Sequence, residues 1–177
     1  MMSDGPGPAV DPAADLRADL TGAFGLPVWG PRMSGFGIGS IFMLEIGQPK
    51  LVHNTPRMQL WWGQWHLGVH MATWRIETPD AVLAASGADR EEMKMGVAAL
   101  DGKVLAGSDV EPPSMSATFF FADGTRLRLF TASRDSDQWC LFRPDEMIRV
   151  VGADYSWKLR RPDEPWSDDT DRLERRR

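Results

Sequence analysis

Apolar residues recur at helical spacing in two segments of the chain, and most other patterned segments alternate with a period of two. The two apolar stripes are Leu16, Leu20, Ala23 and Phe24, followed by Met93, Val97 and Leu100. Asp11 followed by Pro12 is typical of a helix start, and Asp89 is placed to cap the second helix. Gly25 and Gly102 follow the stripes and are predicted to end the two helices.

The alternating segments predict an extended series of β-strands. The expected strands cover residues 27–33, 36–46, 65–77, 103–110, 114–121, 125–131, 138–142, 147–151 and 155–159. Ala122-Asp123-Gly124 is typical of a hairpin turn between two of these strands. Residues 48–60 contain two prolines and Asn54, and this composition predicts a loop.

The chain matches itself when it is shifted by 77 residues. Gly25 then falls on Gly102 and Phe42 falls on Phe119, and the two helical stripes coincide. We therefore predict an α+β fold of two pseudo-repeated units, residues 11–77 and 88–160, within a single domain of residues 11–160. Each unit would be a helix followed by an antiparallel β-meander, with the sheets packed together or joined into one curved sheet. The alternative is that the match at 77 residues reflects only the general similarity of any two helix-and-hairpin units.

Both ends of the chain have the composition of disordered segments. Residues 1–10 are rich in Gly and Pro, and residues 161–177 alternate in charge without core-forming residues.

Charge and cysteine content exclude several classes of protein. The 25 acidic and 20 basic residues give a net charge of −5, which argues against a nucleic-acid-binding protein. No apolar run reaches the about 18 residues of a membrane span, and the first residues lack the features of a signal peptide. The single cysteine, Cys140, excludes an intrachain disulfide. We therefore expect a cytoplasmic protein that binds neither nucleic acid nor membrane.

No motif for catalysis, metal binding or cofactor binding is evident. His66 and His70 share a strand face, but their Cα atoms would lie about 13 Å apart, too far for one zinc ion. Gly35, Gly37 and Gly39 precede a strand, not the helix that a dinucleotide-binding loop requires. We expect no cofactor, no metal and no catalytic residues, although His66 or His70 could act as a general base.

Tryptophan is the residue type with most bearing on function. The chain contains 8 tryptophans, and Trp61 and Trp62 are consecutive, so in a strand their side chains point to opposite faces. Exposed Trp beside Arg is typical of binding hot spots. The candidate binding residues are Arg57, Trp61, Trp62, His66, His70 and Arg75. The alternative is that both sheet faces are covered and that the indoles belong to the core.

Several strings resemble those of a family of small bacterial cytosolic proteins of unknown function. They are Gly37-Ile38-Gly39-Ser40, Leu44-Glu45-Ile46-Gly47, Trp65-His66-Leu67 and Trp74-Arg75-Ile76, which together give the pattern GxGSxxxLExG, then WHL, then WRI. The resemblance covers about residues 20 to 160. It implies an immunity or accessory role and brings no catalytic residues.

Three functions are consistent with these observations. The first is a non-enzymatic partner-binding protein, with another protein as the partner, such as an immunity or accessory protein of a bacterial toxin system. The second is a small-ligand-binding module with a Trp-lined site. The third is a His-dependent enzyme.

Overall fold

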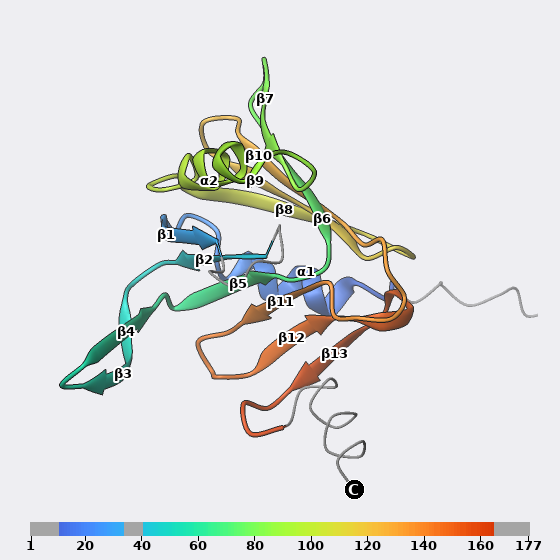
Figure 1. The fold of residues 1–177 in the computed structure, drawn as a ribbon. Helices are drawn as coiled ribbons and strands as arrows, with labels where there is room; N and C mark the ends of the chain where they lie inside the picture. The colour runs from blue at the N-terminus through green and yellow to red at the C-terminus, as the bar shows by residue number, and fades with distance from the viewer. Residues whose placement is uncertain (1–10, 34–40, 165–177) are drawn as a thin grey trace, which may run out of the picture.

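The protein has a mostly β architecture in the computed structural model, which describes residues 11–33 and 41–164 (Figure 1). The elements in chain order are α1 (Ala14–Thr21), β1 (Val28–Met33), β2 (Phe42–Ile46), β3 (Lys50–Thr55), β4 (Met58–Trp62), β5 (Trp65–Val69), β6 (Thr73–Glu77), β7 (Val82–Ala85), α2 (Arg90–Ala98), β8 (Leu105–Glu111), β9 (Ser116–Phe121), β10 (Arg126–Phe130), β11 (Trp139–Phe142), β12 (Ile148–Val151), a 3-10 turn (Ala153–Tyr155) and β13 (Trp157–Arg160). The predicted disordered residues 1–10, the glycines at 35, 37 and 39 and residues 165–177 lie outside the described residues.

The larger sheet has six antiparallel strands in the order β1-β2-β5-β11-β12-β13. Successive side chains of each strand point to opposite faces, and in β5, β11 and β12 both faces are largely buried. Leu44 pairs with Leu67, and Leu67 pairs with Leu141, so one row of leucines crosses three strands and faces the core.

The smaller sheet has five antiparallel strands in the order β7-β6-β10-β9-β8. Its core face meets that of the larger sheet through aromatic side chains. Phe42 of β2 contacts Trp74 of β6 edge-on, with ring centroids 5.1 Å apart. Trp139 of β11 contacts Phe119 of β9 in the same manner at 6.0 Å. The two sheets therefore share one buried core.

Backbone hydrogen bonds join the edges of the two sheets at the N-terminal ends of β1 and β8. The Gly25 N–H donates to the Leu105 carbonyl at 2.8 Å, and the Gly102 N–H donates to the Val28 carbonyl at 2.8 Å. Gly25 and Gly102 have φ angles of +81° and +76°, the left-handed conformation that glycine adopts without strain after a helix. The helices end earlier than the sequence predicts, at Thr21 and Ala98, and Gly25 and Gly102 turn the chain into this junction a few residues later.

The predicted α+β fold of two helix-plus-meander repeats is wrong. Over the described residues the chain is 46% strand and 13% helix, and its strands form three sheets. Each large sheet also contains strands from both halves of the chain. The six-stranded sheet joins β1, β2 and β5 to β11–β13, and the five-stranded sheet joins β6 and β7 to β8–β10. Local patterning correctly indicates helices and strands here, but strand partners are chosen by the shared core.

The third sheet is the two-stranded hairpin β3–β4, which extends away from the two main sheets (Figure 1). It occupies the segment for which the sequence predicted a loop.

No α-helix in the described part of the chain has the length and hydrophobicity needed to cross a membrane.

Candidate functional site

A row of side chains crosses the outer face of the six-stranded sheet, opposite the core. The register pairs Glu45 with His66, His66 with Phe142, and Phe142 with Ile148. Glu45, His66 and Ile148 are buried although they point away from the core, and Phe142 is partly buried. This second covered face places a carboxylate and an imidazole side by side.

Glu45 and His66 form a buried, hydrogen-bonded pair. His66 Nδ1 lies 2.9 Å from both carboxylate oxygens of Glu45. The Gly63 N–H donates to Glu45 Oε2 at 2.8 Å. A Cβ at residue 63 would lie 2.5 Å from the Ile46 nitrogen, so only glycine allows this close approach. The carboxylate thus accepts hydrogen bonds in place of lost water, and it orients the imidazole.

Two aromatic rings hold the His66 imidazole from its other sides. The Trp62 indole stacks on it with centroids 4.9 Å apart and an interplanar angle of 24°. The Phe142 ring meets it edge-on at 5.1 Å. Trp62 and Phe142 also contact each other, at 5.4 Å. The three rings form a cluster in which each side chain fixes the other two.

A pocket of about 550 Å³ opens beside this cluster. It lies between the base of the β3–β4 hairpin, the start of β5 and the β11–β12 turn. Its apolar lining consists of Val52, Trp62, Phe142, Pro144, Ile148 and Pro162. His66 also lines it, and since Nδ1 faces Glu45, Nε2 is the polar atom that His66 offers to the pocket. Within residues 11–33 and 41–164, Nε2 has no hydrogen-bond partner.

The charged side chains at the rim of this pocket are paired with one another. Lys50 Nζ lies 3.3 Å from Glu146 Oε1. Arg143 donates to Asp19 at 2.9 Å and to Asp145 at 2.8 Å. The pocket therefore presents a mostly apolar surface with the His66 imidazole and the Gln64 side-chain amide, without a surplus of charge of either sign.

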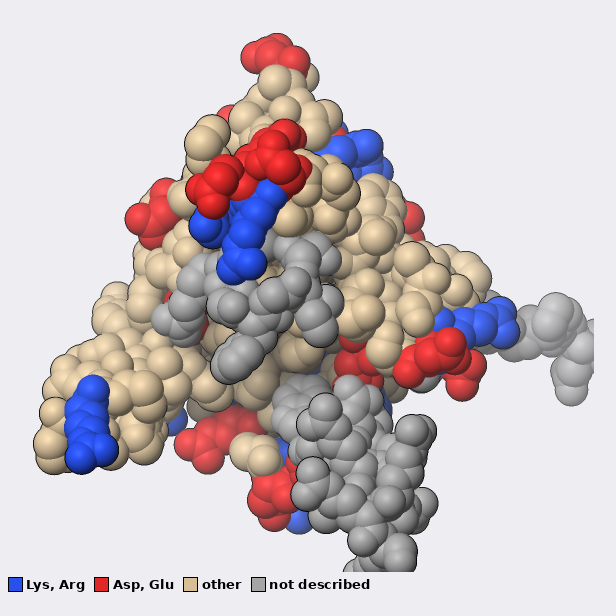
Figure 2. All heavy atoms as spheres, in the orientation of Figure 1, with Lys and Arg blue, Asp and Glu red and all other residues tan. Residues whose placement is uncertain are grey.

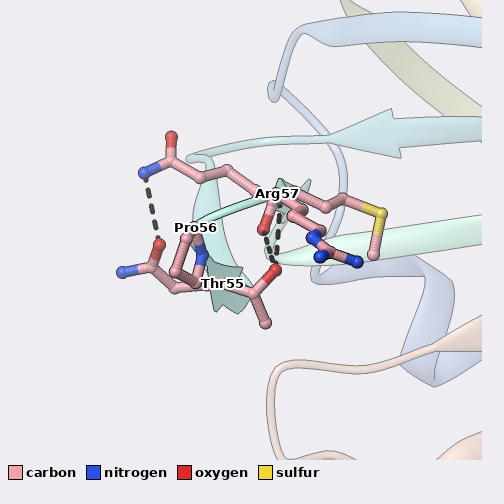
Figure 3. Close-up of a pocket in the computed structure, with 6 residues that line it drawn as sticks. Thr55, Pro56 and Arg57 are labelled. Atoms are coloured by element: carbon pink, nitrogen blue, oxygen red, sulfur yellow. Dashed lines mark hydrogen bonds between the residues drawn. The ribbon is translucent and has the colours of Figure 1, made fainter.

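A second hollow, at the tip of the hairpin, lacks such a lining (Figure 3). Figure 3 shows Thr55, Pro56 and Arg57 around the turn, with hydrogen bonds that stay within the hairpin. The Met58 N–H donates to the Thr55 hydroxyl at 3.1 Å, and the Gln59 amide donates to Asn54 at 3.3 Å. These side chains are exposed, so this hollow is the outside of a turn.

The structure brings together only part of the predicted set of binding residues. Trp62 and His66 stack on each other at the pocket. Trp61, the neighbour of Trp62, points to the opposite face and is 42% exposed. Arg57 lies at the hairpin tip, away from the pocket. Arg75 lies on the five-stranded sheet, where it pairs with Glu77 at 2.8 Å.

His70, the remaining candidate, lies one row away from the pocket, beside the only cysteine of the chain. Its Nε2 is 3.3 Å from the Cys140 sulfur, and a Cβ at Gly68 would lie 2.9 Å from both atoms. Burial raises the pKa of the Cys140 thiol to about 12, because the charged thiolate loses its hydration. The thiol is therefore protonated at neutral pH, which disfavours a role as a nucleophile. In the described part of the chain, no three potential metal-ligating side chains cluster together.

Sequence reasoning missed Glu45 and Phe142 as parts of the site. Glu45 shares strand parity with Ile41 and Met43, and a lone acidic residue in an otherwise apolar strand is a signal of a buried, paired carboxylate. Phe142 carries no such signal, because its contact with His66 depends on which strands pair.

Comparisons with protein-family models, curated proteins and solved structures gave no match for this chain. The family resemblance therefore stays a prediction, and the function must be argued from the geometry of the site.

Proposed function

We propose that this protein binds a small, largely apolar molecule in the pocket beside Trp62 and that His66 recognises a hydroxyl or N–H group of that molecule. The observation that carries this proposal is the buried Glu45–His66 pair at the pocket wall. A carboxylate at Nδ1 favours the tautomer with its proton on that nitrogen, which leaves Nε2 as a hydrogen-bond acceptor.

The lining of the pocket supports this ligand class. A volume of about 550 Å³ lies within the usual range for small-molecule sites. The walls are mostly aromatic, aliphatic and proline side chains, and the rim charges already have partners. A charged ligand would lose its hydration without gaining an unpaired counter-ion, so a neutral or weakly polar molecule fits best.

A matched pair of probes tests the proposal. 2-Naphthol carries the expected donor, and 2-methoxynaphthalene has the same ring system without it. We expect 2-naphthol to raise the melting temperature and quench tryptophan fluorescence, and 2-methoxynaphthalene to do so much more weakly. Trp62→Ala should abolish the effect of 2-naphthol, whereas Trp61→Ala, on the opposite face, should preserve it. Equal responses to both probes, or to neither, would contradict the proposal.

The same geometry favours one second function. An imidazole oriented by a carboxylate and open at Nε2 is the arrangement of a general base. The corresponding test is hydrolysis of 2-naphthyl acetate with and without the His66→Ala substitution. We expect the wild-type rate to exceed the buffer rate and the variant to lose the difference; a wild-type rate equal to that of buffer would remove this second function. The immunity or accessory role stays a prediction.

A further inference from the structure

The β3–β4 hairpin, residues 50–62, forms an arm with unusual exposure. Every residue of β3 is exposed, and over the described residues each arm strand pairs only with the other. Four apolar side chains of the arm, Leu51, Val52, Met58 and Trp61, are exposed by 36%, 39%, 53% and 42%. A two-stranded hairpin alone is marginally stable in water, so contacts on these side chains would stabilise it.

One face of the arm forms an apolar surface with its base. Leu51 and Trp61 are directly paired across the two strands and share this face. At the base, Trp61 lines an apolar hollow of about 500 Å³ together with Trp29 and Pro49. We call this face, made of Trp29, Pro49, Leu51 and Trp61, the arm patch. It faces away from the ligand pocket, because Trp61 and Trp62 point in opposite directions.

The charge of the arm differs from that of the rest of the chain. Residues 46–76 contain no Asp or Glu, although the whole chain has 25 acidic residues and a net charge of −5. Arg57, at the tip of the arm, makes no ion pair with the described residues. Figure 2 shows basic atoms near the end of the arm and no acidic atoms on the visible face of the arm. The arm therefore suits an acidic surface, and the rest of the chain carries a net negative charge.

We propose that the arm patch packs against the arm patch of a second copy of this chain, with the two arms antiparallel about a two-fold axis. A parallel arrangement would place the two Arg57 side chains together, which like-charge repulsion disfavours. In the antiparallel arrangement each tip reaches the base of the partner's arm. Pro56 then lies over the apolar hollow, and Arg57 approaches Asp101, which is exposed and accepts a hydrogen bond from the Gly30 N–H next to Trp29.

Sedimentation analysis of the full chain tests this proposal over a range of protein and salt concentrations. We expect a dimer that Trp61→Ala weakens by about 30-fold or more, as expected for an interface hot spot. Val82→Ala, at a residue that is 59% exposed on β7 of the other sheet, is the control and should leave the dimer unchanged. Circular dichroism and melting temperature confirm that each variant is folded. A wild-type monomer, or a dimer that tolerates Trp61→Ala, would overturn the proposal.

A charge exchange tests the antiparallel arrangement. Arg57→Glu and Asp101→Lys should each weaken the dimer, and the double variant should restore it. Failure of the double variant to recover would overturn this arrangement. If the wild type is a monomer and binds a different acidic protein through Trp61, that protein, and not a second copy of this chain, occupies the arm patch. None of these outcomes depends on the ligand pocket, since 2-naphthol binding is measured separately.

Discussion

Glu45 is the residue whose environment most constrains the site. A fully buried carboxylate persists only where hydrogen bonds compensate for its lost hydration, and here the Gly63 N–H and His66 Nδ1 provide them. The hydrogen bonds between Glu45 and His66 Nδ1 hold the imidazole in one orientation, which a recognition site or a general base requires.

Replacing Glu45 by Gln tests this role. The amide keeps the shape of the side chain but removes the charge, so the hydrogen bonds to it weaken. An amide NH₂ group placed at the Oε2 position would also face the Gly63 N–H, donor against donor. We expect the free energy of unfolding to fall by about 1–3 kcal/mol, measured by chemical denaturation. The control is Glu77→Gln on β6, which pairs with the partly exposed guanidinium groups of Arg75 and Arg128; its expected loss is below about 1 kcal/mol. Equal losses would contradict a special role for Glu45.

Cys140 gives a pH dependence of known sign. Its pKa rises from 9.0 to about 12 on folding, so above pH 9 the unfolded chain loses the thiol proton while the folded chain keeps it. Stability is therefore retained below pH 9 and falls between pH 9 and 12, by at most about 1.4 kcal/mol per pH unit. The measurement is the difference in unfolding free energy between wild type and Cys140→Ala across this range. A difference that does not change with pH would contradict the burial effect.

The sequence identifies part of the site at this scale. Trp62 and His66 are found because each is an unusual residue on a predicted strand or beside one. Their partners are not found, since Glu45 and Phe142 reach His66 only through strand pairing. Arg75 lies away from this pocket because β6, although it follows β5 closely, belongs to the other sheet.

The β3–β4 arm is the element that the sequence describes least well. Pro49, Pro56 and Asn54 favour a loop, and the exposure of both faces removes the alternation that marks a half-buried strand. The helix that begins after Asp89 is predicted well, because its signals are local: the Asp89 carboxylate accepts from the Glu91 and Glu92 N–H groups at 3.0 and 2.9 Å.

Hydrogen exchange should separate the arm from the main sheets. Backbone amides of β3 and β4 are expected to exchange with opening free energies of about 0–2 kcal/mol, because their strands have few buried contacts. Amides of β5 and β11, at the centre of the six-stranded sheet, should approach the protection of global unfolding. Exchange followed by mass spectrometry at low protein concentration measures this for the monomer. Equal protection of arm and central strands would contradict the exposed position of the arm.

The contact between α2 and β7 provides a second prediction at this scale. Helix propensity alone would make Gly96→Ala stabilising by about 1 kcal/mol. However, a Cβ at Gly96 would lie 2.2 Å from the Ala84 Cβ, so the helix would have to move. We expect the clash to dominate and to lower stability by about 1–3 kcal/mol in thermal unfolding. Gly87→Ala, where a Cβ meets no atom within 4 Å, is the control and should be close to neutral.

At the scale of the whole molecule, the two large sheets depend on each other. Both mix strands from the first and second halves of the chain, and one hydrophobic core spans them. The sequence predicts most strands correctly but not their partners, because the glycine positions that suggested a repeat report local turns and not the choice of neighbours. Because of this mixing we expect the whole chain to fold cooperatively.

Cutting the chain between the predicted units tests this interdependence. Fragments 1–87 and 88–177 are each expected to lack a cooperative thermal transition and near-ultraviolet circular dichroism, because each lacks three strands of the six-stranded sheet and two or three strands of the five-stranded sheet. The intact chain, measured under the same conditions, is the control. Independent folding of either fragment would contradict the mixed sheets and support separate units.

Trp61 and Trp62 place two different surfaces of the protein on the same strand. The two indoles are neighbours in β4, and one belongs to the arm patch while the other stacks on His66 at the pocket wall. The strand β4 therefore contributes to both surfaces, and Lys50 of the paired strand β3 lies 3.3 Å from Glu146 at the pocket. Because β4 contributes to both surfaces, linkage sets a condition: if occupancy of the pocket changes the affinity of the arm patch, occupancy of the arm patch changes the affinity of the pocket by the same factor.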